Sequence, residues 1–252
     1  KAYADVVKQA AQKEGAKVVV LSSTTDSLYL APIVAVGLDA GYASNVVALP
    51  VSTSPFQVKR NAFSSKGFTV TELTSDVKVI ALAKNSFGLA EASGAASAED
   101  FAVSLNDADF NIHIQSQEKA SGQVSIADAE IVVSGGRGLK GPENWGMIEE
   151  LASVLGAATA CSKPVSDLDW RPHSEHVGQT GKPVASNLYI AVGISGAIQH
   201  IAGINASKVK VVINQDPEAP FFKVADYGIV GDAFQIVPEL TKKLKEFKAN
   251  NN

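Results

Sequence analysis

A glycine-rich stretch with two cations, residues 134–141 (SGGRGLKG), is the first part of the sequence that could carry chemistry. It follows a short apolar run and precedes Pro142, a residue typical of the first turn of a helix. Its spacing matches G-x-G-x-x-G, the pattern of a turn that binds phosphate with backbone amides at a helix N-terminus. The acidic ribose partner expected about twenty residues later is missing, whereas Arg137 and Lys140 add positive charge. The stretch therefore predicts a pyrophosphate site held by charge as well as by amides; a plain strand-to-helix turn with surface cations is the alternative.

Two more turns place polar side chains after predicted strands. Residues 177–182 (VGQTGK) lack the four-residue spacer of a Walker A loop and do not predict a nucleoside triphosphate site. Residues 193–200 (GISGAIQH) place Ser195 at a predicted helix N-cap and His200 in the same short helix. A lone histidine there could also be a structural residue with satisfied hydrogen bonds. Because parallel strands end at one edge of a sheet, the three turns together favour a single ligand site.

The composition excludes several classes of function. The chain has 252 residues, 46% of them hydrophobic, and a formal net charge of -4, which argues against a basic nucleic-acid surface. No apolar run approaches the roughly eighteen residues of a membrane span. The single cysteine, Cys161, excludes an internal disulfide and fits a reducing compartment. His173 and His176 follow a proline in a loop, and no Cys/His spacing typical of a metal site is present, so no metal is expected.

Residues 1–122 alternate helical and strand-like patterns and are predicted to form an N-terminal α/β domain. The chain opens on a predicted helix that ends at Gly15 and has one apolar face, made of Tyr3, Val6, Val7, Ala10 and Ala11. A second helix, capped by Asp26 and ended by Gly41, is expected to bury Leu28, Ile33, Val34 and Leu38. Strands are expected at 17–21 (buried), 46–51, 68–73 and 77–83, with a hairpin in 59–73. Since an opening helix has no strand to cross over from, we expect the domain to lack its first strand or more.

Residues 123–252 are predicted to form a C-terminal domain with a mainly parallel sheet. Strands are expected at 131–133, 188–194, 208–214 and 227–230. Helices are expected after Pro142, with Ile148, Leu151, Ala152 and Leu155 inward, and from Pro238, with Val237, Leu240, Leu244 and Phe247 inward. The fold class is therefore α/β, with two doubly wound α/β domains. A ligand is expected at the carboxyl ends of the strands of the C-terminal domain.

Four long motifs resemble those of the electron transfer flavoprotein α subunit: VVSGGRGLK, VGQTGK, LYIAVGISGAIQHIAG and VVINQDPEAPFFKVADYGIVGD. The resemblance is dense over 126–247 and looser but collinear over 1–122. It implies a C-terminal domain that binds one extended FAD, and hence a redox carrier rather than an enzyme with a substrate-converting site of its own. It also implies a heterodimer with a β subunit, donors such as acyl-CoA and related dehydrogenases of fatty acid β-oxidation, and an acceptor such as a quinone oxidoreductase. The implied location is the bacterial cytoplasm or the mitochondrial matrix, without membrane insertion.

The same resemblance assigns residues to parts of the FAD. The implied binding residues are Arg137 at the phosphates; Asn214, Asp232 and Ala233 at the adenosine; and Ser162, Lys163, Val177, Gly178, Gln179, Thr180, Ser195, Gly196, Ala197, Ile198, Gln199 and His200 around the isoalloxazine ring. In this assignment the Thr180 hydroxyl lies near N5 of the ring, and His200 reaches the C2 carbonyl. Asp232 also suits the position that opens a helix, which is its structural alternative.

Lys163 departs from the family pattern, which has an arginine at this position. Reduced flavin carries negative charge over N1 and the C2 oxygen, and a unit charge about 4 Å away is worth on the order of 4 kcal/mol at an effective dielectric near 20, or about 100–200 mV for one electron. Lysine keeps the charge but lacks the planar guanidinium that stacks near the flavin. We expect FAD to bind with a shifted potential and a less persistent one-electron-reduced form. Cys161 is expected to pack rather than to exchange electrons.

Two other interpretations fit parts of the sequence. A nucleotide-cofactor-binding α/β enzyme domain would share the glycine turns, since a fold does not determine a function, but it would not be expected to combine GQTGK with GISGAIQH. A non-redox scaffold that has lost its flavin would explain Lys163. Within the family, a simple carrier and a bifurcating system with a second flavin in the β subunit are both open. The visible spectrum of the purified protein separates a flavoprotein from a colourless scaffold.

Overall fold

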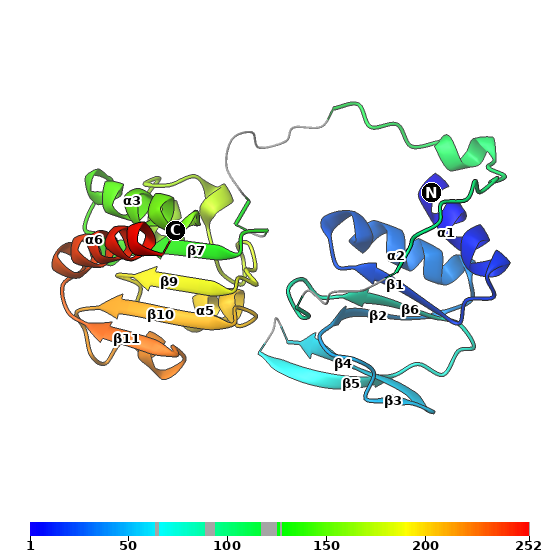
Figure 1. Cartoon of the computed structure of the whole chain (residues 1–252), viewed down its shortest axis with the longest axis horizontal. Coiled ribbons are helices and arrows are strands. Elements are labelled where there is room, and N and C mark those ends of the chain that lie inside the picture. Colours follow the sequence, from blue (N-terminus) through cyan, green and yellow to red (C-terminus); the bar gives the residue numbers. More distant parts are fainter. Residues whose placement is uncertain (64–65, 89–93, 117–124, 127, 252) are drawn as a thin grey trace. The chain divides into compact units, whose positions relative to one another are not determined.

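The structure is a computed structural model that describes residues 1–63, 66–88, 94–116, 125–126 and 128–251. The chain divides into two compact units, one made of Lys1–Phe63 and Gly67–Glu118 and the other containing Lys119–Asn252 (Figure 1). The predicted domain boundary between residues 122 and 123 lies outside the described residues. Within the part of the chain that is described, no helix combines the length and the apolar character needed to cross a membrane.

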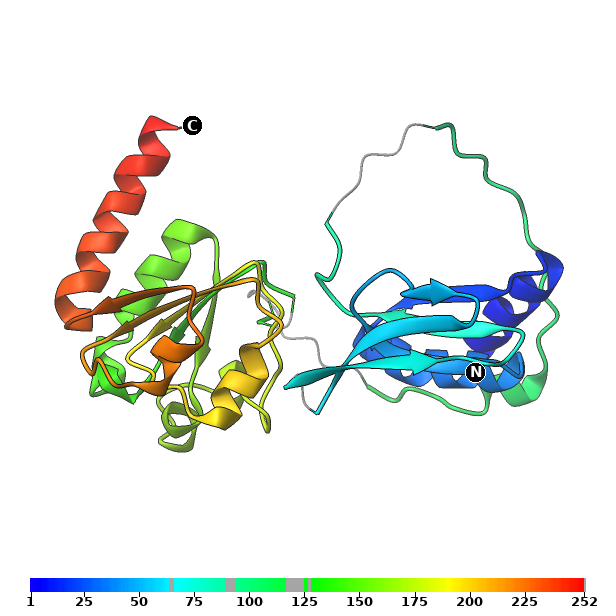
Figure 2. The same cartoon turned by 90° about the horizontal axis from the view of Figure 1, so that it is seen from below.

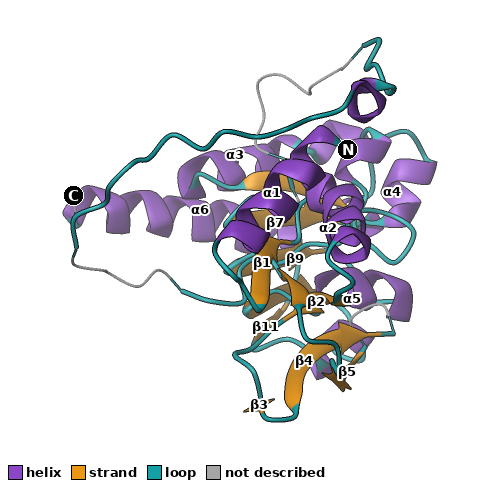
Figure 3. Ribbon diagram, turned by 90° about the vertical axis from the view of Figure 1, so that its right-hand side faces the viewer, coloured by secondary structure: helices purple, strands orange, loops and turns teal. Residues whose placement is uncertain are grey.

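The first unit is built on a mixed sheet with the strand order β1-β6-β2-β4-β3, in which β5 also pairs with β4. Its elements are α1 (Ala2–Lys13), β1 (Val18–Ser22), α2 (Thr25–Gly37), β2 (Gly41–Val46), β3 (Ser52–Thr53), β4 (Phe56–Ala62), β5 (Gly67–Glu72), β6 (Lys78–Leu82) and η1 (Asp107–Phe110). Strands β1, β6 and β2 are parallel, whereas β4 pairs antiparallel with β2, β3 and β5. Helix α2 packs on the parallel strands and α1 packs on α2, so this unit is an α/β layer structure (Figure 3).

The second unit is built on a five-stranded sheet in the order β11-β10-β9-β7-β8, and each neighbouring pair of strands is parallel. Its elements are β7 (Ile131–Gly135), η2 (Arg137–Leu139), η3 (Pro142–Asn144), α3 (Gly146–Leu155), β8 (Ala158–Cys161), α4 (Lys163–Asp167), η4 (His173–Glu175), β9 (Leu188–Val192), α5 (Ile198–Ile204), β10 (Val209–Asn214), η5 (Pro220–Lys223), β11 (Tyr227–Val230) and α6 (Ala233–Asn250). The predicted fold class, two α/β domains with a parallel sheet in the C-terminal one, is confirmed.

Helices cover both faces of the second sheet (Figure 2). Side chains alternate between the two faces along a strand, and on β9 Tyr189 joins a core with Ile204 of α5. Its neighbour Ile190 joins the other core, which contains Leu151 of α3 and Val237 of α6. Each such fully buried apolar side chain contributes about 1.5–3 kcal/mol. Because both faces are buried along β7 and β9, these strands are nearly continuous apolar runs, which makes them recognisable in the sequence.

Most predicted strands are confirmed. The runs 131–133, 188–194, 208–214 and 227–230 form β7, β9, β10 and β11, and 68–73 and 77–83 form β5 and β6; the predicted hairpin is the β4-β5 pair. The strand predicted at 46–51 is wrong, because β2 ends at Val46 and the Val47 amide then donates to the Lys59 carbonyl of β4 at 3.0 Å. The run 17–21 forms β1, but as an edge strand with Val18 and Val20 38% and 57% exposed rather than as a buried one.

Some large side chains predicted to face inward are exposed. They are Tyr3, Leu28, Ile33 and Phe247. In the first unit the buried positions of the two helices are taken largely by small residues, such as Ala4 of α1 and Ala31 of α2. The rest of the two predicted faces is confirmed, since Ala11 of α1 and Val34 of α2 are buried. Val7 and Leu38 pack against the same core.

The ends of α2 also differ from the prediction. Thr24 rather than Asp26 is the N-cap, and its hydroxyl accepts a hydrogen bond from the Ser27 amide (N to O 3.2 Å). The helix ends at Gly37 with Leu38 as its C-cap, whereas Gly41 begins β2.

In the second unit, α6 begins earlier than predicted. Asp232 is its N-cap and accepts a hydrogen bond from the Phe234 amide at 3.0 Å, which confirms the structural alternative for Asp232. Pro238 lies inside this helix instead of opening it. The predicted N-cap of α5 is wrong as well: Ala197 occupies that position, and Ser195 lies two residues earlier in the turn.

Substitutions at Thr24 and Asp26 test which of the two residues is the N-cap of α2. We expect Thr24→Ala to lower the free energy of unfolding by about 1 kcal/mol, because the Ser27 amide loses its acceptor. Asp26→Ala should cost at most about half of that, since an exposed first-turn carboxylate contributes only through the helix dipole. Urea unfolding of the full chain measures both values, and a larger loss for Asp26→Ala would contradict the assignment.

Candidate functional site

Turns from different strands of the second unit are tied together at the carboxyl edge of the sheet. The Gly136 amide, directly after β7, donates to the last carbonyl of β9 (N to O 2.8 Å), and the Gly138 amide donates to the Gly193 carbonyl at 3.0 Å. On the other side of β7, the Ser162 amide donates to the Gly135 carbonyl at 3.1 Å. The turns after β7, β8 and β9 therefore share backbone hydrogen bonds.

The turn 177–180 belongs to the same edge. The Val177 amide donates to the Cys161 carbonyl at the end of β8 (N to O 3.0 Å), and the Gln179 amide donates to the Gln199 carbonyl of α5 at 2.8 Å. The structure thus brings together the three glycine-rich turns that the sequence predicts to share one edge.

Close backbone approach explains the glycines of the turn after β7. A Cβ atom on Gly136 would lie 2.2 Å from the Gly193 carbonyl oxygen, and one on Gly138 would lie 2.8 Å from the Gly193 Cα atom. Gly193 itself has φ +64°, a conformation that favours glycine. No side chain larger than hydrogen fits between these two turns without moving them.

The backbone hydrogen bonds of this turn correct one part of the prediction, which was that its amides, together with its cations, hold a pyrophosphate. The amides of residue 136 and of residues 138–141 all donate to backbone carbonyls. The groups at this turn that can attract an anion are therefore the exposed side chains of Arg137 and Lys140. The Lys140 ammonium lies 5.1 Å from the centroid of the Phe234 ring at the start of α6.

All residues assigned to the site by sequence lie in these turns or at adjoining ends of strands and helices. Arg137, Lys163, Gln179, Thr180, Ser195, Ala197, Ile198 and Gln199 are exposed; Asn214 and Asp232 are half-buried; and Ser162, Val177, Gly178, Gly196, His200 and Ala233 are buried. An open edge with exposed polar groups and a 69% exposed Ile198 suits a ligand that lies along the surface.

The two residues expected at the adenosine end hold the local backbone. The Asn214 side-chain amide donates to the Ile194 carbonyl at 3.0 Å, which links the ends of β9 and β10. Its side-chain oxygen accepts from the Asp216 amide at 3.0 Å. Since Asp232 caps α6, both side chains support the turns of this edge in addition to any contact with a ligand.

His200 is a buried, neutral histidine. Its Nε2 lies 2.9 Å from the Tyr189 hydroxyl, and its ring packs 6.2 Å (between centroids) from Phe221. Burial, reinforced by the nearby His176, lowers the pKa of His200 to about 4. At neutral pH the imidazole therefore acts as a dipole, whose effect on a charged ligand is weaker than that of a cation.

Four buried polar atoms in the described part of the second unit have no hydrogen-bond partner. They are Ser134 Oγ, Trp145 Nε1, His176 Nδ1 and His200 Nδ1. All four residues lie at the carboxyl edge or directly beside it, since Trp145 packs against Gly135. Buried polar atoms are hydrogen bonded in about 90% or more of cases, so this set fits an edge where a polar ligand or water completes the bonding.

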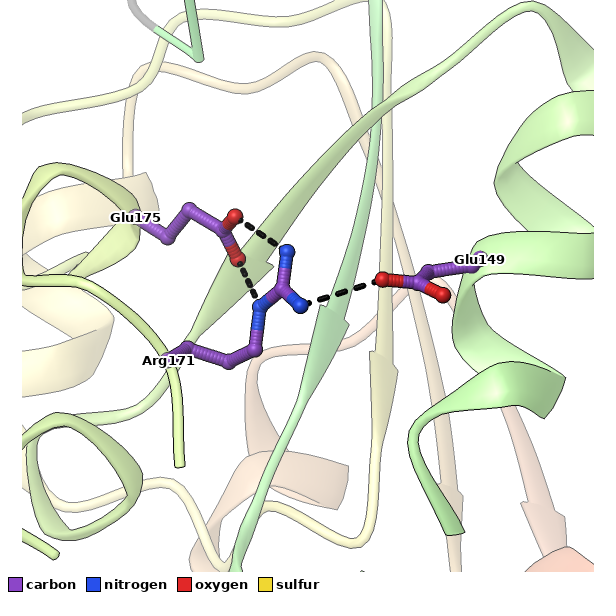
Figure 4. Close-up of polar contacts among 3 residues, drawn as sticks. All are labelled: Glu149, Arg171 and Glu175. Atoms are coloured by element: carbon purple, nitrogen blue, oxygen red, sulfur yellow. Dashed lines mark hydrogen bonds and ion pairs between the residues drawn. The ribbon is translucent and has the colours of Figure 1, made fainter. Parts of the chain in front are cut away.

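An ionic network beside the turn 177–180 was not recognised from the sequence. Arg171 lies between Glu175, with N to O distances of 2.9 and 2.6 Å, and Glu149 of α3, at 3.0 Å (Figure 4). In the sequence, the only sign of this network is that Arg171 and Glu175 have opposite charges and are four residues apart. The partner on α3 depends on the tertiary fold. Tyr189, the partner of His200, was missed for the same reason.

A cavity in the first unit and a metal-binding cluster are the alternatives to a site at the carboxyl edge. A surface cavity of about 440 Å³ lies in the first unit, between residues of α1 and α2 such as Lys8 and Ile33, and it contains none of the predicted FAD-binding residues. Among the described residues, no three His, Cys, Asp or Glu side chains are grouped to hold a metal ion. The carboxyl edge of the second sheet remains the candidate site.

The close approach of Gly136 to the Gly193 carbonyl can be tested with a matched pair of substitutions. We expect Gly136→Ala to lower the free energy of unfolding by about 1–3 kcal/mol, because the added methyl group overlaps the Gly193 carbonyl. Gly146→Ala, at the first position of α3, places its Cβ where nothing lies within 4 Å and should stabilise by up to about 1 kcal/mol. Denaturant unfolding measures both; similar values for the two variants would refute the close contact.

The burial of His200 gives a pH dependence with a defined sign. Its folded pKa of about 4 lies below the ordinary value of 6.5, so the unfolded chain binds the proton first as the pH falls. The stability that comes from the neutral His200 is present above pH 6.5 and is lost as the pH falls from 6.5 to 4, by about 2–3 kcal/mol at pH 4.5. The C2 proton of His200, followed by NMR, should not titrate above about pH 5. A midpoint near 6.5 would contradict this environment.

Comparison with known proteins agrees with this geometry. A family model described as the electron transfer flavoprotein FAD-binding domain matches residues 125–205, which contain the turns after β7, β8 and β9. A second model, described as the electron transfer flavoprotein domain, matches residues 1–107.

Full-length relatives extend the match over most of the chain. The electron transfer flavoprotein subunit alpha of Bacillus subtilis is 38% identical over 99% of this chain and 77% of that protein. The corresponding subunit of Paracoccus denitrificans is 42% identical over 88% of this chain and 71% of that protein. The mitochondrial subunit of Dictyostelium discoideum is 46% identical over 75% of this chain and 56% of that protein. The chain therefore belongs to the electron transfer flavoprotein subunit alpha family, and its role is electron transfer with FAD as the cofactor.

Proposed function

We propose that this chain carries one FAD along the carboxyl edge of its second sheet, as one subunit of a heterodimeric electron carrier. In this proposal a β subunit completes the protein. The donors are acyl-CoA and related flavoprotein dehydrogenases, and the acceptor is a protein such as a quinone oxidoreductase. The observation that supports it most strongly is the meeting of three turns at one open edge within the segment that matches the FAD-binding domain. Bound FAD would supply the ability to take up and release electrons one at a time.

The side chains at the edge suggest how the cofactor is oriented. Arg137 and Lys140 would bind the phosphates through charge, because the amides of their turn are engaged with carbonyls. Asn214 and Asp232, with Ala233, would lie at the adenosine end. Residues 177–180 and 195–200 would lie around the ring, with Thr180 exposed and His200 buried below it.

Lys163 is the cation proposed to lie at the ring. It is exposed at the start of α4, directly after the buried Ser162. Burial and the neighbouring His173 lower the pKa of His176, and the Lys163 charge makes a smaller contribution in the same direction. His200, in contrast, is neutral at physiological pH. Stabilisation of a reduced, negatively charged ring would therefore depend on the lysine ammonium more than on the imidazole.

In this proposal the chain transfers electrons and does not itself convert an organic substrate. The Cys161 thiol is fully buried, and burial raises its pKa to about 12, so it is not available as a nucleophile. Ser166 lies 3.4 Å from His173, a long contact for a nucleophile and its base, and its side chain is buried in α4. These environments favour a carrier over a hydrolase or transferase.

The proposed partners and location rest on the relatives. Each of the compared proteins is named a subunit alpha, which supports assembly with a different subunit. Two are bacterial, and the Dictyostelium protein is named as mitochondrial, so we propose the bacterial cytoplasm or the mitochondrial matrix as the location.

The function and the role of Lys163 are tested together by potentiometry. The purified protein should be yellow, with one FAD per chain, and the Lys163→Arg variant should raise the first one-electron potential by about 20–80 mV, because a planar guanidinium stacks on the ring and an ammonium does not. Lys208→Arg, an exposed lysine at the opposite end of the strands, is the matched control. A colourless protein would refute the flavoprotein proposal, and equal potentials in all three proteins would refute the role of Lys163.

A further inference from the structure

The Arg171 guanidinium makes two kinds of ionic contact. Its Nε and one NH2 group donate to the two carboxylate oxygens of Glu175 at 2.9 and 2.6 Å, in a bidentate arrangement. Its remaining nitrogen donates to Glu149 of α3 at 3.0 Å (Figure 4). The guanidinium carbon also lies 5.4 Å from the centroid of the Trp145 ring, which belongs to the core under α3.

Of the two ionic contacts of Arg171, the one with Glu175 is shielded from solvent. The Glu175 side chain is 7% exposed and that of Arg171 19%, whereas the Glu149 side chain is 54% exposed. The hydrogen bonds that Arg171 donates to Glu175 raise the pKa of Arg171, so the guanidinium stays charged. A buried bidentate pair is sensitive to the removal of either partner, while an exposed single contact contributes little.

The buried carboxylate lies two residues before the turn 177–180. Between them, the His176 carbonyl accepts from the Lys182 amide at 2.9 Å, and the Val177 amide donates to the Cys161 carbonyl at 3.0 Å. Glu175 is thus directly joined to the residues whose backbone hydrogen bonds hold the two ends of this turn. Residues 172–174 are exposed, and of these His173 contacts Ser166 and the His176 ring. Contacts of Arg171 with Glu149 and with the Trp145 ring connect the segment to the start of α3.

We propose that Arg171 is a positioning residue, which holds the turn 177–180 in its binding geometry by fixing Glu175 against α3 and Trp145. This inference rests on the proposed function, in which that turn lies against the flavin ring. Arg171 itself would not touch the cofactor, because its donors are occupied by two carboxylates.

Hydrogen exchange of the FAD-free chain tests, in the absence of the cofactor, whether Arg171 holds the turn 177–180. Because a lone buried Glu175 could unfold the protein, the test variant is the double substitution Arg171→Met/Glu175→Gln, which removes both charges. We expect the protection of the Val177, Gln179 and Lys182 amides to fall by about tenfold or more, and that of the Gly136 and Gly138 amides to change by less than about twofold.

The matched control removes another ion pair of α3. Lys245 contacts Glu150 at 2.6 Å, and both side chains are more than half exposed; Lys245→Met/Glu150→Gln should leave the exchange of both turns unchanged. Equal loss of protection in the two turns of the test variant would mean that Arg171 only supports global stability, and this would overturn the inference. Unchanged protection of the turn 177–180 would overturn it as well.

A second measurement links the turn to the cofactor. In chains loaded with FAD, the test variant should release FAD about tenfold faster than the parent and the control variant, as judged by recovery of flavin fluorescence. If the parent takes up no FAD, the proposed function fails, while the exchange result still decides whether Arg171 holds the turn. If the parent binds FAD and the test variant releases it at the same rate, only the positioning role fails.

Discussion

Backbone contact between the turn after β7 and the turn after β9 is the constraint on which the candidate site depends. Gly136 and Gly138 approach Gly193 so closely that a Cβ atom on either would lie within 2.8 Å of it, and two amide-to-carbonyl hydrogen bonds join the turns. The turn after β8 and the turn 177–180 are attached to this pair through Ser162 and Cys161. Four segments that are far apart in the sequence therefore form one rigid edge, held by main-chain bonds that are largely independent of side-chain identity.

This arrangement determines which groups are free to bind a ligand. Because the amides of residues 136 and 138–141 donate to backbone carbonyls, the proposed binding mode assigns recognition of the phosphates to exposed cations such as Arg137. It assigns polar contacts with the ring to side chains such as Thr180, which is also exposed. Below the edge, burial keeps His200 neutral and Cys161 protonated, so the interior adds dipoles and packing rather than charge. In the proposed binding mode, the electrostatic effect on a reduced flavin therefore depends on the exposed Lys163.

The sequence was informative where local signals and the fold agree. The inner strands β7 and β9 of the second unit are apolar runs buried on both faces. The turns carry glycines at the points of contact, so both the parallel sheet and the meeting of the turns were predictable. The inward faces of α1 and α2 were predictable only in part. Val34 is buried as predicted, but Leu28 and Ile33 are exposed, and small residues such as Ala31 fill buried positions. The pairs Arg171–Glu149 and Tyr189–His200 could not be found either, because they join segments that meet only in the folded chain. Ser195 suited an N-cap, but the chain begins α5 two residues later.

The most direct test of the central claim is a map of amide chemical-shift changes by NMR when the FAD-free chain is titrated with FAD. Changes at residues 136–140, 177–180 and 195–200, with further changes at Asn214 and Asp232, are the predicted result. The residues that line the cavity between α1 and α2, such as Lys8 and Ile33, should be unaffected. Changes confined to that cavity, or an unperturbed edge in the second unit, would contradict the account.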